Sequence, residues 1–146
     1  MVLRFRYKTV ERPQPYGVRA LPVVPVTYLG RNGEAFESAA LLDSGADYSI
    51  IFVEHAEILG VDLSSCEKTD CQGVGGKVKA WKTKVQVRLK GKGEHRSFTF
   101  ELPVMVIERQ ASNFPLLLGR EGFFEHFEIT FNEKARWLSL KPLAVQ

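Results

Sequence analysis

Hydrophobic and polar residues alternate along most of this chain with the two-residue period of β-strands, not the 3.6-residue period of helices. The alternation is clearest at residues 3–7, 23–29, 35–42, 85–89 and 98–102. Short glycine-rich turns separate these segments, and Asn32-Gly33 between two of them is typical of a hairpin turn. Many short strands joined by such turns predict an all-β protein folded as a closed barrel.

Two segments depart from this pattern and predict short helices. One helix is expected over residues 52–59, where Gly60 follows at the position of a helix C-cap. The second is expected over residues 120–126, after the short apolar strand at residues 115–118. The chain then closes with a predicted hairpin that includes a strand at residues 137–140.

Residues 1–20 are predicted to form an N-terminal extension, and residues 21–146 to form a single domain. The extension begins with a strand in which Arg4, Arg6 and Lys8 alternate with apolar residues, and a proline-containing linker or turn follows. We interpret the charged face as the solvated side of an edge strand. This strand is expected to pair with residues 137–140, either within one chain or across a dimer interface.

Composition is that of an ordinary globular domain, with 45% hydrophobic and 25% charged residues among 146. The net charge of +3 comes without a long basic run interleaved with aromatic residues, so no nucleic-acid partner is expected. No apolar run is long enough to span a bilayer, and the N-terminus lacks the apolar core of a secretory signal. We therefore expect a cytoplasmic protein.

The two cysteines, Cys66 and Cys71, have no second ligand pair of the kind that zinc sites use. They are interpreted as free thiols in a reducing compartment, with a disulfide across a hairpin base as the alternative. No metal and no cofactor is expected.

The candidate chemistry begins with Asp43, which directly follows an apolar strand ending in Leu42. A carboxylate at such a position is costly unless it has polar partners. Ser44 supplies a hydroxyl, and Gly45 lacks a Cβ, so another chain or a substrate can approach closely. Taken alone, Asp-Ser-Gly is a weak signal that also suits an ordinary turn after a strand.

Two further motifs follow in order: Gly73-Val74-Gly75-Gly76, and the apolar run Leu116-Leu117-Leu118 that ends in Gly119-Arg120. With Leu41-Leu42-Asp43-Ser44-Gly45-Ala46, they make residues 23–131 resemble the retropepsin family, the retroviral-type aspartic proteases and their cellular and bacterial relatives. The resemblance implies a closed acid-protease barrel with a flap hairpin and one or two short helices.

The resemblance also implies a role for each matched residue. Asp43 matches the catalytic aspartate, in a motif completed by Ser44, where threonine is common, and Gly45. Substrate binding is implied for Ala46 and Asp47, and for the flap residues Gly73, Val74, Gly75 and Gly76. Gly119 and Arg120 are implied to support the site, and Arg120 is expected to form an ion pair with Asp47.

The sequence contains a single Asp-Ser-Gly, whereas acid proteolysis of this kind uses two carboxylates. The second is therefore expected from another copy of the chain across a two-fold axis. The resulting prediction is a homodimeric aspartic endopeptidase acting on peptide or protein substrates without a cofactor. The alternative is a catalytically idle retropepsin-like module that dimerises or binds extended peptides, and a regulatory protease dedicated to one partner protein also remains open.

Overall fold

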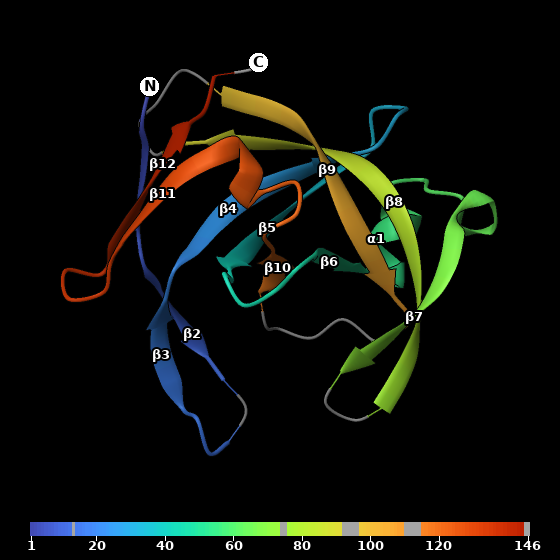
Figure 1. Cartoon of the computed structure of the whole chain (residues 1–146), viewed down its shortest axis with the longest axis horizontal. Coiled ribbons are helices and arrows are strands. Elements are labelled where there is room, and N and C mark those ends of the chain that lie inside the picture. The colour runs from blue at the N-terminus through green and yellow to red at the C-terminus, as the bar shows by residue number, and fades with distance from the viewer. Residues whose placement is uncertain (13, 74–75, 92–96, 110–114, 145–146) are drawn as a thin grey trace.

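The computed structural model describes residues 1–12, 14–73, 76–91, 97–109 and 115–144, and the strands within them form three sheets (Figure 1). In chain order the elements are β1 (Leu3–Arg6), β2 (Lys8–Glu11), β3 (Val18–Leu21), β4 (Val23–Leu29), β5 (Ala35–Leu42), β6 (Ser49–Phe52), α1 (Val53–Ile58), the 3-10 helix η1 (Leu63–Ser65), β7 (Glu67–Gly73), β8 (Gly76–Lys90), β9 (Ser97–Ile107), β10 (Leu116–Leu118), the 3-10 helix η2 (Phe124–His126), β11 (Phe127–Asn132) and β12 (Trp137–Pro142).

The largest sheet returns on itself. Its strand order is β4-β5-β10-β6-β9-β8-β7, and β4 also pairs with β8 from Val26 opposite Leu89 to Leu29 opposite Gln86. This extra pairing closes six of the strands into a ring, with β7 attached outside it as the partner of β8. The prediction of an all-β barrel is confirmed.

The two-residue alternation places one face of each strand in the core. On β8, Val85, Val87 and Leu89 are buried while the residues between them are exposed. A fully buried side chain of this size contributes roughly 1.5–3 kcal/mol relative to its exposed state. The hydrophobic pattern therefore fixes which face of β8 turns inward, because a shift of one residue would expose all three side chains.

The N-terminal segment joins the same core. β1 pairs antiparallel with β12 of its own chain, with Leu3 opposite Leu140, and β12 pairs in turn with β11. Leu3 and Phe5 are both buried. Of the two partners considered for this strand, the structure shows the one within the chain.

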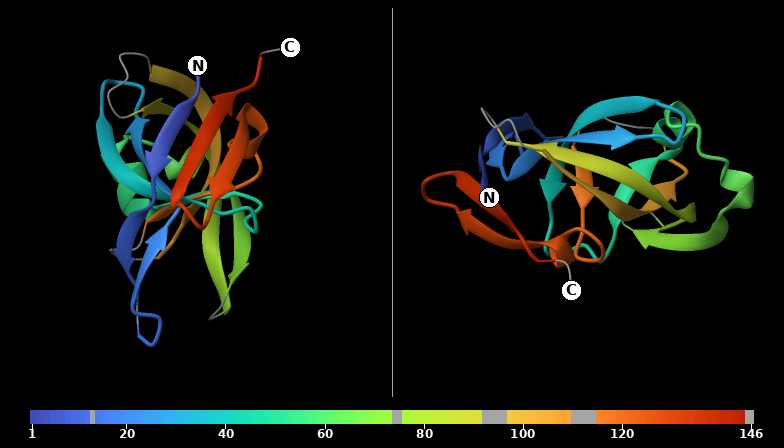
Figure 2. Two further views of the ribbon diagram at one scale, coloured as in Figure 1. Left: turned by 90° about the vertical axis from the view of Figure 1, so that its left-hand side faces the viewer. Right: turned by 90° about the horizontal axis from the view of Figure 1, so that it is seen from above.

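β2 and β3, on either side of the proline-containing segment expected to be a linker or turn, pair antiparallel as a hairpin from Lys8 opposite Leu21 to Glu11 opposite Val18. These two strands form a separate two-stranded sheet that projects from the body of the molecule (Figures 1 and 2). β3 leads almost directly into β4, with Pro22 between them.

The first predicted helix is confirmed and the second is wrong in extent. α1 covers Val53–Ile58, and Gly60 follows it with a left-handed φ of 71°. The segment predicted as helical at residues 120–126 forms only a turn and the short η2. Gly122 has a φ of 81°, which a right-handed helix cannot include, and the space beside it is filled by the ring of Pro103.

Candidate active site

Asp43 lies at the end of β5, where a three-strand arrangement holds its backbone. β10 runs parallel to β5 and antiparallel to β6, so it is hydrogen-bonded between them. Leu118 is opposite Leu42, and the amide of Asp43 donates to the carbonyl of Leu118 at 3.0 Å. The backbone of Asp43 is therefore held in place where the chain leaves the barrel.

A tight turn then orients the carboxylate. The amide of Gly45 donates to Oδ1 of Asp43 at 2.9 Å, and the amide of Ala46 donates to the Asp43 carbonyl at 3.1 Å. A Cβ at residue 45 would lie 3.2 Å from the same Oδ1, so glycine leaves the carboxylate room. Asp43 is half-buried, whereas Ser44 and Gly45 are exposed. The turn expected of Asp-Ser-Gly thus forms, and it leaves the Asp43 side chain partly accessible at the end of the strand.

The segment that follows β10 fastens the loop after Asp43. The amide of Arg120 donates to the carbonyl of Ala46, and the amide of Glu121 donates to the carbonyl of Asp47, both at 2.9 Å. Nη2 of Arg120 also pairs with Oδ1 of Asp47 at 2.5 Å, which confirms the predicted ion pair. Two parts of the chain more than seventy residues apart are thereby joined beside Asp43.

The two parts of the chain approach each other most closely at Gly119, which lies against the backbone of Tyr48 and bonds to Ser49. A Cβ at Gly119 would overlap the backbone of Tyr48, lying 2.5 Å from its carbonyl carbon and 2.8 Å from its nitrogen. The Gly119 amide donates to Oγ of Ser49 at 3.0 Å, and Ser49 is 1% exposed. Sequence reasoning identified Gly119 but missed Ser49. A serine at the start of an apolar strand carries no local signal of a partner seventy residues away.

The hairpin of β7 and β8 stands where the sequence predicts a flap. Its strands pair from Glu67 opposite Lys82 to Gly73 opposite Gly76. Val74 and Gly75, the expected tip, lie outside the described residues. The hairpin projects on the same side of the molecule as the loop after β5, and the β2–β3 hairpin projects on that side too (Figures 1 and 2). The structure thus brings Asp43, Ser44, Gly45, Ala46, Asp47, Gly119 and Arg120 together and places the hairpin on their side of the molecule.

Other side chains of chemical interest have structural partners. Cys66 is a free thiol whose Sγ donates to the carbonyl of Asp62 at 3.3 Å. The side chain of Cys71 is outside the described set. His126 packs against Phe100 in a tilted arrangement with ring centroids 4.4 Å apart, and its Nδ1 contacts the carbonyl of Gly122. In the described part of the chain, no helix is both long and apolar enough to cross a membrane.

Comparisons with known proteins agree with this geometry. A family model described as aspartyl protease matches residues 24–121. The fold is similar to the crystal structure of a retropepsin-like aspartic protease from Rickettsia conorii, with 17% identity, a TM-score of 0.60 and coverage of 96% of this chain and 98% of that one. It is also similar to the retroviral protease-like domain of Ddi1 from Leishmania major, with 23% identity, a TM-score of 0.53 and coverage of 85% and 94%. No curated protein sequence matches this chain.

The family match spans more than half of the chain and includes both Asp43 and Arg120. The structural similarity to the Rickettsia protein extends over nearly the whole chain. The chain therefore belongs to the aspartyl protease family, and its fold is retropepsin-like.

Proposed function

We propose that this chain is one subunit of a homodimeric aspartic endopeptidase in which each subunit contributes Asp43. The observation that carries the proposal is the position of this carboxylate: it is half-buried, oriented by the amide of Gly45 and followed by exposed residues at the end of a barrel strand. None of the other aspartates is followed by Ser-Gly, and two of them already have side-chain partners. Asp47 pairs with Arg120, and Asp62 accepts from the amide of Ser64 at the start of η1.

Two aspartates that meet across a two-fold axis would supply the chemistry of peptide hydrolysis. One carboxylate accepts a proton from a water molecule as it attacks the scissile carbonyl, and the protonated partner donates to the developing oxyanion. Two carboxylates a few ångströms apart cannot both ionise easily, so the pair holds a single proton and titrates as a unit. A single chain with one such aspartate would be inactive.

The loop after β5 supports this mechanism because it is rigidly held. Backbone hydrogen bonds from Arg120 and Glu121 fix the carbonyls of Ala46 and Asp47, so the carboxylate of Asp43 need not be ordered when substrate binds. Catalytic groups held in position before the reaction avoid an entropic cost at the transition state. Ser44 is exposed beside Asp43, and its hydroxyl would form a hydrogen bond to the other subunit of the dimer.

Substrate would lie between the dyad and the β7–β8 hairpin. A peptide in an extended conformation can pair with free backbone groups of a hairpin, and glycines such as Gly73 and Gly76 let the two backbones approach. We propose that this hairpin closes over the substrate as a flap, and that Ala46 and Asp47 bind the peptide from the opposite side. Closure of this kind would exclude water from the reacting bond.

The test is cleavage of a mixed peptide library between about pH 4 and 7, a range chosen around the expected titration of a carboxylate pair. Wild type is compared with Asp43→Asn, and Asp62→Asn serves as the matched control. Asparagine at position 62 can still accept from the amide of Ser64, so this control should fold and cleave normally. The oligomeric state of each protein is measured in the same buffers.

We expect cleavage by wild type and by Asp62→Asn that follows the dimer fraction, and loss of cleavage in Asp43→Asn. Cleavage that survives in Asp43→Asn would overturn the assignment of the catalytic residue. A well-formed wild-type dimer that cleaves no library peptide would overturn general endopeptidase activity and favour a module that binds peptides or a protease with one dedicated substrate.

A further inference from the structure

A second concave site lies against the outer strand β1, and neither Asp43 nor the residues of the loop that follows it line this site. It is a groove of about 880 Å³ between β1, the start of β4 and the end of β8. We call it the β1 groove, and its lining includes Arg4, Arg6, Lys8, Val23, Pro25 and Lys90. Neither the aspartyl protease match nor the proposed catalytic mechanism assigns it a role.

One wall of the β1 groove is a strand edge whose backbone groups have no strand partner among the described residues. In that part of the chain β1 pairs with β12 on one side only, within the sheet order β1-β12-β11. The amide of Tyr7 donates to the carbonyl of Arg136 at 2.9 Å, which sets which residues of β1 bond to β12. Because antiparallel strands alternate between bonded and non-bonded pairs, the backbone groups of Arg4 and Arg6 point away from β12. Both residues line the groove.

The opposite wall is a second incomplete edge. The amide of Leu42 donates to the carbonyl of Pro22 at 3.0 Å, so by the same alternation Val23 turns its N–H and C=O, and Pro25 its C=O, away from β5. Among the described residues, β8 pairs with this edge of β4 from Val26 onward. Val23 and Pro25 line the groove, and its two walls therefore present a strand edge each.

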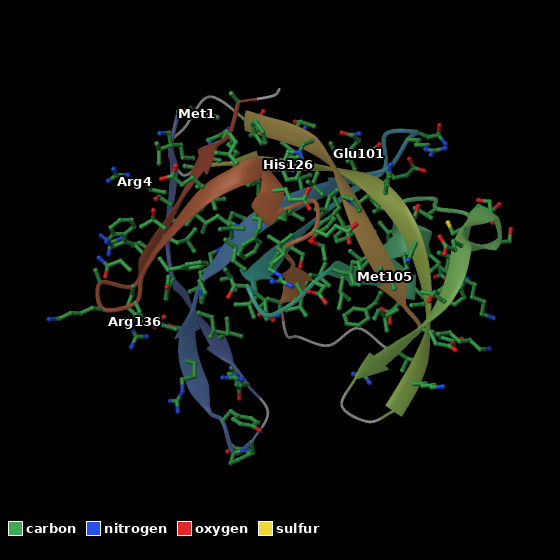
Figure 3. The ribbon with its side chains drawn as sticks, in the orientation of Figure 1. Met1, Arg4, Glu101, Met105, His126 and Arg136 are labelled. Carbon is green, nitrogen blue, oxygen red and sulfur yellow. The ribbon has the colours of Figure 1, made fainter. Side chains whose placement is uncertain are left out.

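The side chains around these edges are strongly cationic. Arg4, Arg6, Lys8 and Lys90 line the groove, and its described lining includes no carboxylate. Glu133, on the turn between β11 and β12, accepts from the hydroxyl of Tyr7 at 3.4 Å. Figure 3 shows Arg4 and Arg136 along the same side of the molecule. The turn that contains Glu133 therefore also carries a cation, Arg136.

We propose that the β1 groove binds an acidic peptide segment in an extended conformation, which pairs as an added strand with the free edge of β1. Free backbone donors and acceptors recognise an extended chain, and clustered cations select one that carries glutamate or aspartate. A second copy of this chain is a poor occupant, since its net charge of +3 has the same sign as the groove. The groove would serve as a docking site for an acidic region of a substrate or partner protein, independently of Asp43.

The experiment measures binding of a fluorescein-labelled peptide of about eight residues, alternating glutamate with valine, by fluorescence anisotropy. The full chain carrying Asp43→Asn is used, so that the probe is not cleaved. Three comparison probes are included: the same peptide with glutamine in place of glutamate, the same peptide with proline at alternate positions, and a single-stranded oligonucleotide of equal charge.

We expect saturable binding of the acidic peptide that weakens as salt is raised, and little binding of the glutamine and proline peptides. The double variant Arg4→Gln/Arg6→Gln should weaken binding by at least about tenfold, since it removes two cations at the strand edge. Lys90→Gln removes a cation from the opposite wall of the groove and leaves β1 unchanged. Arg88→Gln/Lys141→Gln removes the same charge from exposed positions outside the groove and should leave the affinity within about twofold.

The remaining outcomes would overturn the proposal. No binding of the acidic peptide, or equal binding by Arg4→Gln/Arg6→Gln with an unchanged circular dichroism spectrum, excludes the groove as its site. Equal binding of the proline peptide excludes strand addition, and tighter binding of the oligonucleotide would assign the groove to nucleic acid. Each of these results is independent of whether Asp43 supports cleavage.

Discussion

Replacing Ser49 by alanine should destabilise this protein more than breaking the Asp47–Arg120 ion pair beside the candidate site. Ser49 is 1% exposed, and its Oγ accepts from the amide of Gly119. Alanine removes the acceptor and leaves a buried N–H without a partner, which costs about 1–3 kcal/mol. We therefore expect the free energy of unfolding to fall by about 2 kcal/mol.

The ion pair has the shorter contact but the smaller contribution. The side chains of Asp47 and Arg120 are 67% and 63% exposed, so water and salt screen their attraction. Exposed pairs contribute roughly 0–1 kcal/mol, and Arg120→Gln should fall in that range. Burial, and not formal charge, decides the ranking of the two contacts.

The assay is urea denaturation of Ser49→Ala, Arg120→Gln and wild type at one protein concentration, because dimerisation would make stability depend on concentration. Ser38→Ala is the matched control. The Oγ of Ser38 donates to the carbonyl of the adjacent Ala39 at 3.1 Å, and the residue is half-buried. If Ser49→Ala unfolds like wild type, or if Arg120→Gln is the more destabilised variant, the ranking of the buried hydrogen bond above the exposed ion pair is wrong.

Three further predictions concern the barrel and α1. Gly119→Ala should lower the free energy of unfolding by about 1–3 kcal/mol, because its Cβ would overlap the backbone of Tyr48, and urea denaturation measures the change. The hydroxyl of Tyr28 is buried without a hydrogen-bond partner among the described residues, so Tyr28→Phe should leave stability unchanged or raise it by about 1 kcal/mol, and a lower denaturation midpoint would contradict this. Burial lowers the pKa of His55 from its ordinary 6.5, so the unfolded chain takes up the proton first and stability should fall as pH drops below 6.5. In a series of Tm against pH, His55→Gln should show a shallower fall than wild type.

Most strands could be predicted from the sequence because local signals agree there. β4 and β5 form at residues 23–29 and 35–42 as predicted, since Asn32-Gly33 fixes the turn and the alternation on either side fixes the faces. The Asp43 turn was equally accessible, because its hydrogen bonds join residues two or three apart.

The errors and omissions involve residues that are distant in sequence. The helix predicted at residues 120–126 fails because Gly122 adopts a positive φ against Pro103, and nothing nearby in the sequence reports that contact. The role of Ser49 depends in the same way on β10 being placed beside β6. The hydrophobic pattern of the sequence indicates whether a segment is a strand or a helix. The conformation of Gly122 and the role of Ser49 depend instead on which elements become neighbours in the fold.

The central claim is that two copies of Asp43, one from each chain, act together. It is tested most directly by mixing wild type with an equal amount of Asp43→Asn under conditions of subunit exchange, and measuring peptide cleavage per wild-type chain. If the dyad is shared, mixed dimers are inactive and activity per wild-type chain should fall to about half. Activity per wild-type chain that stays unchanged, with exchange verified by mass spectrometry, would show that one chain suffices and would contradict the account.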